Sequence, residues 1–177
     1  ILPEYKKTHP LVEISIVEGN SDELEDKLQH GMIDLMFGFL PVMLESVETV
    51  ELLKERLFLV VPKAFTDEIF KQKSDFMRGK FSESADIMVF KDYPMLMLKE
   101  GNRIRGIMDS FFNSKRIKPK IVLETDNIET ALALSVRGMG ITVYPEMFLK
   151  NINPTSEEKI DLFPLTSPST ICTLAIS

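Results

Sequence analysis

Apolar and polar residues follow two different periods along the N-terminal part of this chain. Over residues 12–16 they alternate, which predicts a strand with one buried face. Residues 20–31 carry apolar residues at helical spacing, with Asn20 or Ser21 placed to cap the first turn, Asn20 and Glu23 spaced for a capping box, and Gly31 placed to end the last turn. The run over residues 33–39 is almost continuously apolar, which is typical of a strand buried on both faces of a parallel sheet. The pattern therefore predicts a strand, helix, strand unit with parallel strands.

The same order of elements returns in the second half of the chain. A strand is predicted over residues 120–125, a helix over 128–137 and a strand over 140–145. Gly138 and Gly140 lie between this helix and this strand, in the segment RGMGITVYP. A loop that binds a nucleotide phosphate needs the order strand, glycines, helix, so that the amides of the helix start face the phosphate. We therefore predict that Gly138 ends the helix and that Gly140 lets the strand begin tightly.

Two helices and two strands are predicted between these units, and the first strand is the β-rich run over residues 53–62 that ends at Pro62. Thr66 and Gly79 are placed to begin and end one helix, and residues 93–98 form an apolar run typical of a short buried strand. The second helix lies within residues 100–117. It carries an apolar stripe at helical spacing, made of Ile104, Ile107, Met108, Phe111 and Phe112. A stripe of this kind indicates core packing or a subunit contact rather than a cofactor site.

The C-terminal residues indicate how the two units are connected. Residues 160–165 and 170–176 are predicted strands around a turn, and the last is apolar on both faces, so it needs a sheet to enter. The simplest arrangement returns the chain to the first unit. We therefore predict an α/β fold of two Rossmann-like lobes, with residues 1–62 and 146–177 in lobe I and residues 63–145 in lobe II. Two crossover strands join the lobes, with hinge residues Val61, Pro62, Tyr144 and Pro145.

Composition narrows the possible functions. The 177 residues are 44% hydrophobic and 27% charged with a net charge of −6, which is typical of a globular chain and argues against a nucleic-acid groove, because DNA binding requires clustered Lys and Arg. No stretch reaches the roughly 20 apolar residues of a membrane span. The single cysteine, Cys172, lies in an apolar run that suits a buried position and a reducing compartment, so we expect a cytoplasmic protein. Residues 1–10 read as the end of a helix, so we expect a segment before Ile1.

Residues that usually carry catalysis are sparse. His9 and His30 each lie at a predicted helix end, where a solvated position is a commoner role than that of a general base. Cys172 has neither histidine near it in sequence, and the motifs of serine hydrolases, zinc proteases and CxxC proteins do not occur. We therefore predict that the protein is not an enzyme and has no catalytic residues, metal site or cofactor.

A binding site is better supported. In open α/β sheets the ligand lies beyond the carboxyl ends of the strands, where helix N-termini present free amide groups. In this chain these positions are residues 18–21, 38–39, 99–103 and 125–127, which a cleft between two lobes would bring together. Arg103, at a predicted helix start, is suited to bind the carboxylate or phosphate of a ligand. The alternative interpretation is that Arg103 is an ordinary charged residue on the surface.

Several segments together resemble the effector-binding domain of LysR-type transcriptional regulators. They are ILPEYKKTHPLVEISIVEGNSDELEDKLQHGMIDLMFG, then ERLFLVVP, GNRIRGIMDSFF, a P-x-I-x-x-E-T motif and RGMGITVYP. The resemblance extends over essentially the whole chain. It implies a fold like that of type 2 periplasmic binding proteins and a ligand-sensing function. A small metabolite would bind between the lobes and modulate DNA binding by an N-terminal winged helix-turn-helix domain that lies outside this chain.

The resemblance also implies which residues border the effector cleft. They are Asn20, Ser21, Gly38, Phe39, Gly101, Asn102, Arg103, Thr125, Asp126 and Asn127. The implied partners are a small-molecule effector, anionic at Arg103, and further copies of the chain in a homodimer or homotetramer, with no membrane contact. In such a dimer the helix that ends at His9 packs on the helix of residues 104–112 of the other subunit. Phe39 stands where a small polar residue is frequent in the family, which implies a more apolar pocket.

Two alternatives stay open from the sequence. The same architecture serves extracytoplasmic solute-binding receptors, which an upstream leader peptide or lipid-attachment cysteine would favour and an upstream basic helix-turn-helix would exclude. The other alternative is a small two-lobed α/β enzyme, which requires a paired acid and base in the cleft.

Overall fold

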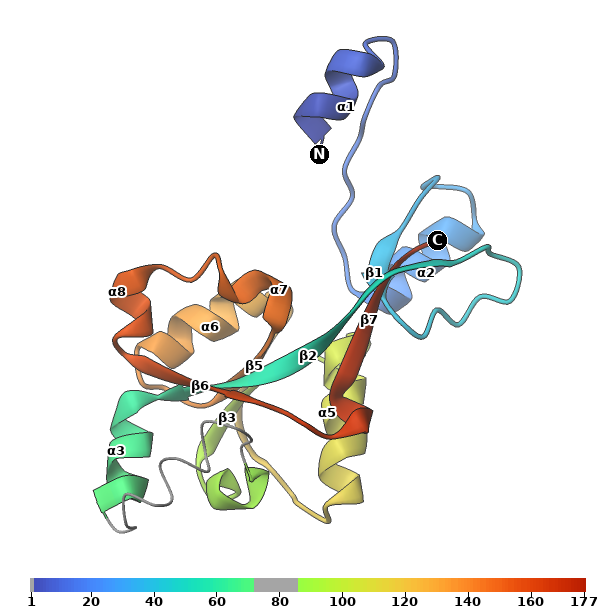
Figure 1. Ribbon diagram of the computed structural model, residues 1–177. Coiled ribbons are helices and arrows are strands. Elements are labelled where there is room, and N and C mark those ends of the chain that lie inside the picture. Colours follow the sequence, from blue (N-terminus) through green and yellow to red (C-terminus); the bar gives the residue numbers. More distant parts are fainter. Residues whose placement is uncertain (1, 72–85) are drawn as a thin grey trace.

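The computed structural model describes residues 2–71 and 86–177, which form a mixture of helices and strands (Figure 1). The first elements are α1 (Leu2–Thr8), α2 (Ser21–Gln29), β1 (Phe37–Phe39), β2 (Val50–Pro62), α3 (Lys63–Lys71) and the 3-10 helix η1 (Ile87–Phe90). Next come β3 (Pro94–Leu98), α5 (Arg103–Ser114), β4 (Lys120–Thr125), α6 (Ile128–Val136) and β5 (Thr142–Pro145). The last are α7 (Glu146–Leu149), α8 (Pro154–Glu157), β6 (Ile160–Pro164), the 3-10 helix η2 (Pro168–Thr170) and β7 (Ile171–Ile176). None of the helices in this described part is long and apolar enough to cross a bilayer.

The long strand β2 belongs to two sheets and connects them. Residues 50–56 of β2 pair antiparallel with β7, which pairs on its other side with β1. Residues 57–62 pair antiparallel with β5 on one side and β6 on the other. Figure 1 shows β2 running through the length of the molecule, from β1 and β7 at one end to β6 at the other. The C-terminal strand therefore enters the sheet that contains β1, as predicted.

These pairings differ from the predicted lobe boundaries. β2 leaves the first sheet and enters the second between Arg56 and Leu57, and the chain passes back to the first sheet between β6 and β7. The four predicted hinge residues lie beyond these points, in paired positions of the second sheet: Val61, Pro62, Tyr144 and Pro145. Residues 160–164 likewise pair in the second sheet rather than with the first, because β6 takes the edge of β2 opposite β5.

The second predicted unit is present as β4, α6 and β5, but its last strand pairs differently from the prediction. β4 is parallel to β3, and a single parallel bridge joins Met95 of β3 to Ile141, whereas β5 itself pairs antiparallel with β2. α6 connects β4 to β5 and lies against β5 and β2. Gly138 follows α6 with a φ of +84°, which suits a glycine at a helix end. A Cβ on Gly140 would lie only 2.9 Å from the Pro94 carbonyl oxygen, so the close approach to β3 requires a glycine there.

The first predicted unit is only partly right. α2 has its expected capping box, in which Asn20 and Glu23 bond each other's backbone amides, and Gly31 has a φ of +65°. The predicted strand over residues 12–16 is wrong, because this segment is exposed and pairs with no other strand among the described residues. The strand predicted over residues 33–39 is limited to β1, and it pairs antiparallel with β7. Alternation reports a side-chain pattern but does not determine which strand supplies the hydrogen bonds.

The N-terminal helix is separate from the sheets. The predicted helix ahead of Pro10 is present as α1, and none of its residues is buried. Figure 1 shows α1 apart from both sheets, at the end of the extended segment that leads to α2. α3 begins at Lys63, so the prediction that Thr66 caps it is wrong. The buried Thr66 hydroxyl instead donates to the Lys63 carbonyl and the Asp161 carboxylate. Gly79 lies outside the described residues.

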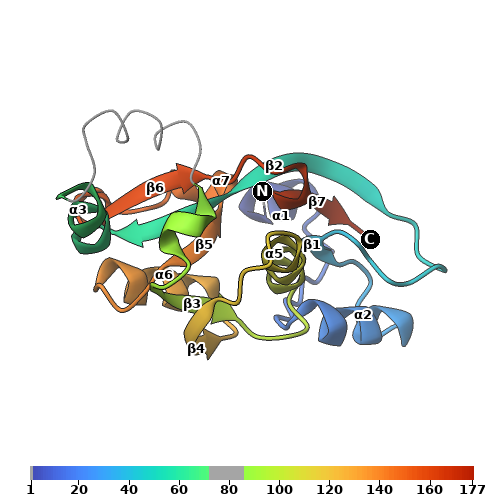
Figure 2. The same ribbon diagram turned by 90° about the horizontal axis from the view of Figure 1, so that it is seen from below.

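The main core is continuous across both sheets. It joins residues of β2, β3, α5 and β7, among them Leu57, Met97 and Cys172. Four residues of the predicted α5 stripe are buried in it: Ile104, Met108, Phe111 and Phe112. The core interpretation of the stripe is therefore confirmed, and those four side chains are not available for the subunit contact that the resemblance implied. Figure 2 shows α5 near β7 and beside β3, and α5 contacts η2, which precedes β7, and β3 of the separate two-stranded β3–β4 sheet.

Candidate functional site

The structure brings two of the predicted segments, around Asn20 and around Arg103, to one place together with the turn after β1, which was not predicted; we name this place the interlobe seam. It comprises the N-terminus of α2 (residues 20–25), the turn after β1 (residues 40–43) and the turn and first residues of α5 (residues 99–103). Gly101 has a φ of +85°, and a Cβ on it would lie 3.1 Å from an Asp22 carboxylate oxygen. The same Cβ would lie 3.6 Å from Asn20 Oδ1, so the start of α2 faces Gly101. Ser21 is the first residue of α2, and the Asn102 side chain caps α5 by accepting from the Ile104 amide at 2.9 Å.

The guanidinium of Arg103 ties the two sides of the seam together. Its Nη1 donates to Asp22 Oδ1 at 3.0 Å, and its Nη2 donates to the carboxylate of Glu25. Its Nε donates to the Pro41 carbonyl oxygen at 2.7 Å. Arg103 and Glu25 are both largely buried, with side-chain exposures of 15% and 7%, so this contact is shielded from water. We name this set of contacts, between α5, α2 and the turn after β1, the Arg103 clasp.

The clasp also fixes the turn after β1. The second carboxylate oxygen of Glu25 accepts a hydrogen bond from the Met43 amide at 2.9 Å. Arg103 was predicted from the sequence to hold a carboxylate, and in this structure it holds two that belong to the protein itself. The sequence analysis missed Asp22, Glu25 and the Pro41 carbonyl. A usable signal was the spacing of Asp22 and Glu25, which places both acids on one face of α2.

The predicted residues 125–127 lie beside the turn that precedes α5. The Lys99 amide donates to the Thr125 carbonyl at 3.0 Å, and Lys99 Nζ donates to Asp126 Oδ2 at 2.5 Å. This hydrogen bond to Asp126 raises the pKa of Lys99, and the nearby charges of Glu124 and Glu23 act in the same direction. The Asn127 side chain caps α6 by accepting from the amides of Glu129 and Thr130. Lys99 therefore links this segment to the charges of the seam.

Gly38 and Phe39 have a different environment. Both lie in β1, opposite Ala175 and Leu174 of β7. Phe39 is partly buried and packs against the main core. Their contribution to the seam is to position the turn that carries Pro41.

The seam contains cations that the protein itself neutralises. Lys99 and Arg103 face Asp22, Glu25 and Asp126 in ion pairs. Three of the five N–H groups of Arg103 donate to Asp22, to Glu25 and to the Pro41 carbonyl oxygen, so a ligand carboxylate that binds this guanidinium competes with acceptors that belong to the protein.

A second set of polar contacts lies where β2 changes sheets. Glu55 is buried, and one of its oxygens accepts from the Met147 amide at 2.7 Å. Its other oxygen has no hydrogen-bond partner among the described residues, and burial raises the pKa of this carboxyl. Arg56 donates to both oxygens of Glu146 at 3.0 and 2.6 Å, which lowers the pKa of Glu146. Glu55 and Arg56, where β2 passes from one sheet to the other, therefore bond the first two residues of α7.

The residues considered for catalysis have structural roles. Cys172 is buried in the main core, so the interpretation of a buried small side chain is confirmed. This burial is the main reason that the pKa of the thiol is raised to about 12. His9 stacks on Tyr5, and His30 bonds the Asp26 carbonyl at the end of α2. In the part of the chain that the structure describes, no group of three or more His, Cys, Asp or Glu is placed to hold a metal ion.

The fold defines the class of the protein. Residues 1–173 match the family model of the LysR substrate binding domain, so the chain belongs to that family. Its α/β fold is the predicted one, similar to type 2 periplasmic binding proteins. The chain is therefore an effector-binding domain of the LysR type.

Particular relatives are similar over most of the chain. YcgK of Bacillus subtilis (strain 168), an uncharacterized HTH-type transcriptional regulator, is 27% identical over 160 residues, which cover 87% of this chain and 49% of YcgK. The chain thus spans about half the length of the curated relatives it matches. The CcmR regulatory domain of Synechocystis PCC6803 in complex with 2-PG has a TM-score of 0.76 at 16% identity, covering 99% of this chain and 77% of that one. The effector binding domain of QuiR in complex with shikimate has a TM-score of 0.71 at 19% identity, covering 98% and 77%.

Proposed function

We propose that this domain senses a small organic anion at the interlobe seam and transmits its presence to an attached DNA-binding domain. Three findings support the proposal. The chain belongs to the LysR substrate binding domain family, its relative YcgK is an HTH-type regulator, and the similar QuiR domain is complexed with shikimate, a carboxylate. The observation that carries the proposal is the Arg103 clasp, which unites the two sides of the seam through one anion-binding group.

The clasp supplies the two states that a sensor needs. In one state, Asp22 and Glu25 occupy Arg103 and hold α2 against α5. In the other state, the carboxylate of the effector occupies Arg103, and α2 loses its charged contacts to α5. A ligand shifts such an equilibrium only by its differential affinity for the two states. Competition for a single guanidinium provides that difference, because the fork binds one carboxylate well in a bidentate geometry.

The change at the seam extends to the first sheet. Glu25 also holds the Met43 amide, and Pro41 is held by Arg103, so release of the clasp loosens the turn after β1 together with α2. β1 belongs to the same sheet as β7 and the first half of β2. We place DNA contact in a domain outside this chain, as expected for an HTH-type regulator and for a domain with a net charge of −6.

A thermal-shift screen tests the proposal. Small carboxylates, sugar phosphates, amino acids and their neutral amide counterparts are added at equal ionic strength. We expect at least one anion to raise the melting temperature, since a ligand at a hundred times its Kd stabilises the folded state by about 2.7 kcal/mol. The matching amide should give no shift. Stabilisation by the amide equal to that by the anion would contradict the assignment of Arg103 as the effector-binding group, as would a hit whose effect survives in Arg103→Gln.

A further inference from the structure

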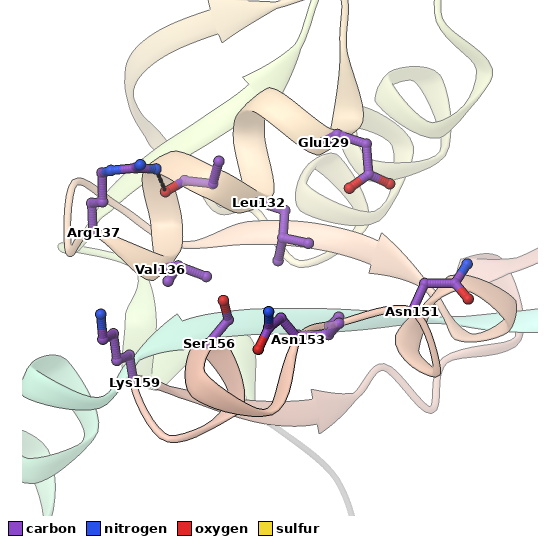
Figure 3. Close-up of a pocket in the computed structure, with 10 residues that line it drawn as sticks. Glu129, Leu132, Val136, Arg137, Asn151, Asn153, Ser156 and Lys159 are labelled. Carbon is purple, nitrogen blue, oxygen red and sulfur yellow. Dashed lines mark hydrogen bonds between the residues drawn. The ribbon is translucent and has the colours of Figure 1, made fainter.

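We propose a second ligand site, separate from the interlobe seam, that takes a small organic anion with a short apolar body. A cavity of about 360 Å³ lies between α6 and the chain segment that contains α8 (Figure 3). This volume falls within the roughly 300–1,000 Å³ of small-molecule pockets. None of the residues predicted for the effector cleft lines it. We name it the α6 pocket.

The floor of the α6 pocket is apolar. It is formed by Leu132 and Val136 on one face of α6 and by Ile152, which belongs to the same apolar cluster. These side chains belong to the second apolar cluster of the molecule, which also contains Val60 and Tyr144, and Leu132 and Ile152 are buried. An aliphatic group of a ligand placed on this floor would leave water and contact an existing core.

One end of the α6 pocket presents cations and hydrogen-bond donors. Arg137, just after α6, and Lys159, just before β6, stand on opposite sides of it. Arg137 Nη1 donates to the Ala133 carbonyl at 3.0 Å, which orients its guanidinium along the helix. Figure 3 shows the ammonium of Lys159 directed towards α6.

Asn153 adds a donor whose orientation is fixed. Its Oδ1 accepts from the Thr155 amide at 3.0 Å and from the Thr155 hydroxyl at 2.5 Å. Because Oδ1 accepts both hydrogen bonds, the other terminal atom of the Asn153 side chain is the NH₂ group. Figure 3 shows this group pointing towards α6, beside the Ser156 hydroxyl. Two positive charges and these donors therefore surround one end of the pocket, which is the chemistry that a carboxylate requires.

The other end of the pocket carries the opposite charge. Glu129 lines it and accepts a hydrogen bond from the buried Tyr144 hydroxyl. A ligand carboxylate is repelled at Glu129 and attracted at Arg137 and Lys159, so the ligand has one orientation, with its apolar body along Leu132, Val136 and Ile152. This separation of charge across an apolar floor is the reason for assigning an amphipathic anion rather than a simple ion.

The probe for the test is hexanoate, with hexanamide, acetate and inorganic phosphate as comparisons. Uniformly ¹⁵N-labelled protein is titrated at constant ionic strength and followed by two-dimensional ¹H–¹⁵N NMR. We expect hexanoate to cause saturable shifts in the amides of α6 and of residues 151–159. Affinity should rise from acetate to hexanoate by roughly threefold to fourfold per buried methylene. Hexanamide should bind at least about tenfold more weakly, because it cannot form charge-assisted hydrogen bonds.

Matched lysine variants decide whether the pocket holds the anion. Lys159→Gln should weaken hexanoate binding by about fivefold or more, as should Arg137→Gln. Lys118→Gln, which removes an equally exposed charge outside the pocket, should leave it unchanged. The proposal is overturned if hexanoate gives no saturable shifts, if its shifts are confined to the seam, or if hexanamide or phosphate binds as tightly. Equal effects of Lys159→Gln and Lys118→Gln would also overturn it. Because these readouts lie outside the seam, they are independent of the effector proposed for Arg103.

Discussion

Replacing Phe112 with alanine is expected to lower the free energy of unfolding by about 3–5 kcal/mol. Phe112 lies on α5, is only 2% exposed and packs in the main core, with its ring centroid 6.1 Å from that of Phe111. Truncation leaves a cavity between the sheets, since the surrounding strands of the core collapse only partially. Urea unfolding monitored by circular dichroism measures the loss, at an unchanged m-value.

Phe37 provides the matched control for this variant. It is the same residue type but is 62% exposed at the edge strand β1, so Phe37→Ala should cost no more than about 1 kcal/mol. Size-exclusion chromatography in parallel separates core packing from a subunit contact. If Phe112→Ala shifted the oligomeric state but cost no more stability than Phe37→Ala, the assignment of the α5 stripe to the core would be wrong.

The second large effect is expected on binding. Arg103→Gln should weaken the anion identified by the thermal-shift screen by about tenfold to hundredfold, which corresponds to the roughly 1.5–3 kcal/mol of a hydrogen bond to a charged group. The physical reason is the loss of the planar fork that pairs with a carboxylate in two parallel hydrogen bonds. Isothermal titration calorimetry of the wild-type and variant domains measures the change directly.

Two further variants make this result interpretable. Arg103→Lys keeps the charge but not the fork, so its affinity should lie between those of wild type and Arg103→Gln. Lys118→Gln removes one exposed charge elsewhere and should bind like wild type. Glu25 is buried and loses its partner in Arg103→Gln, so titrations are made at a temperature where unfolding curves show every variant folded. Unchanged affinity in Arg103→Gln would exclude this arginine from the site.

Sequence reasoning succeeded where the signal was local. The Asn20 and Glu23 capping box, the helix ends at Gly31 and Gly138 and the α5 stripe all depend on residues within one or two turns of each other. The order strand, helix, strand of the second unit was likewise predicted from local patterns. The predicted approach of the loop at Asn20 to the turn at Gly101 followed from the rule that ligands bind beyond the carboxyl ends of strands.

It failed where the outcome depends on contacts between distant segments. The alternating residues 12–16 predict a strand only if a neighbouring strand supplies hydrogen bonds, and β1 pairs instead with β7, from the other end of the chain. Threonine is a residue type that often caps helices, but Thr66 is buried against Asp161 of β6, which no local pattern reveals. The helix α3 therefore begins at Lys63, before the predicted cap.

The candidate site shows the same division. Arg103 was identified from its position at a helix start, but its partners Glu25 and Pro41 lie far from it in sequence and come from two other elements. The contacts of Glu55 with Met147 and of Arg56 with Glu146 likewise join β2 to α7 across a long stretch of chain. Pairing of this kind depends on the arrangement of the sheets, so the sequence indicates the charged groups but not which of them meet.

Competition between the effector and the protein's own carboxylates is tested most directly by Asp22→Asn. Asp22 is the exposed acid of the Arg103 clasp, so its replacement weakens the internal competitor while leaving Glu25 and the guanidinium in place. Calorimetric titration with the anion from the screen should show tighter binding than in wild type, by up to about fivefold, because an exposed ion pair contributes roughly 0.2–1 kcal/mol. Affinity that is equal to or weaker than that of the wild-type domain would contradict the competition at Arg103.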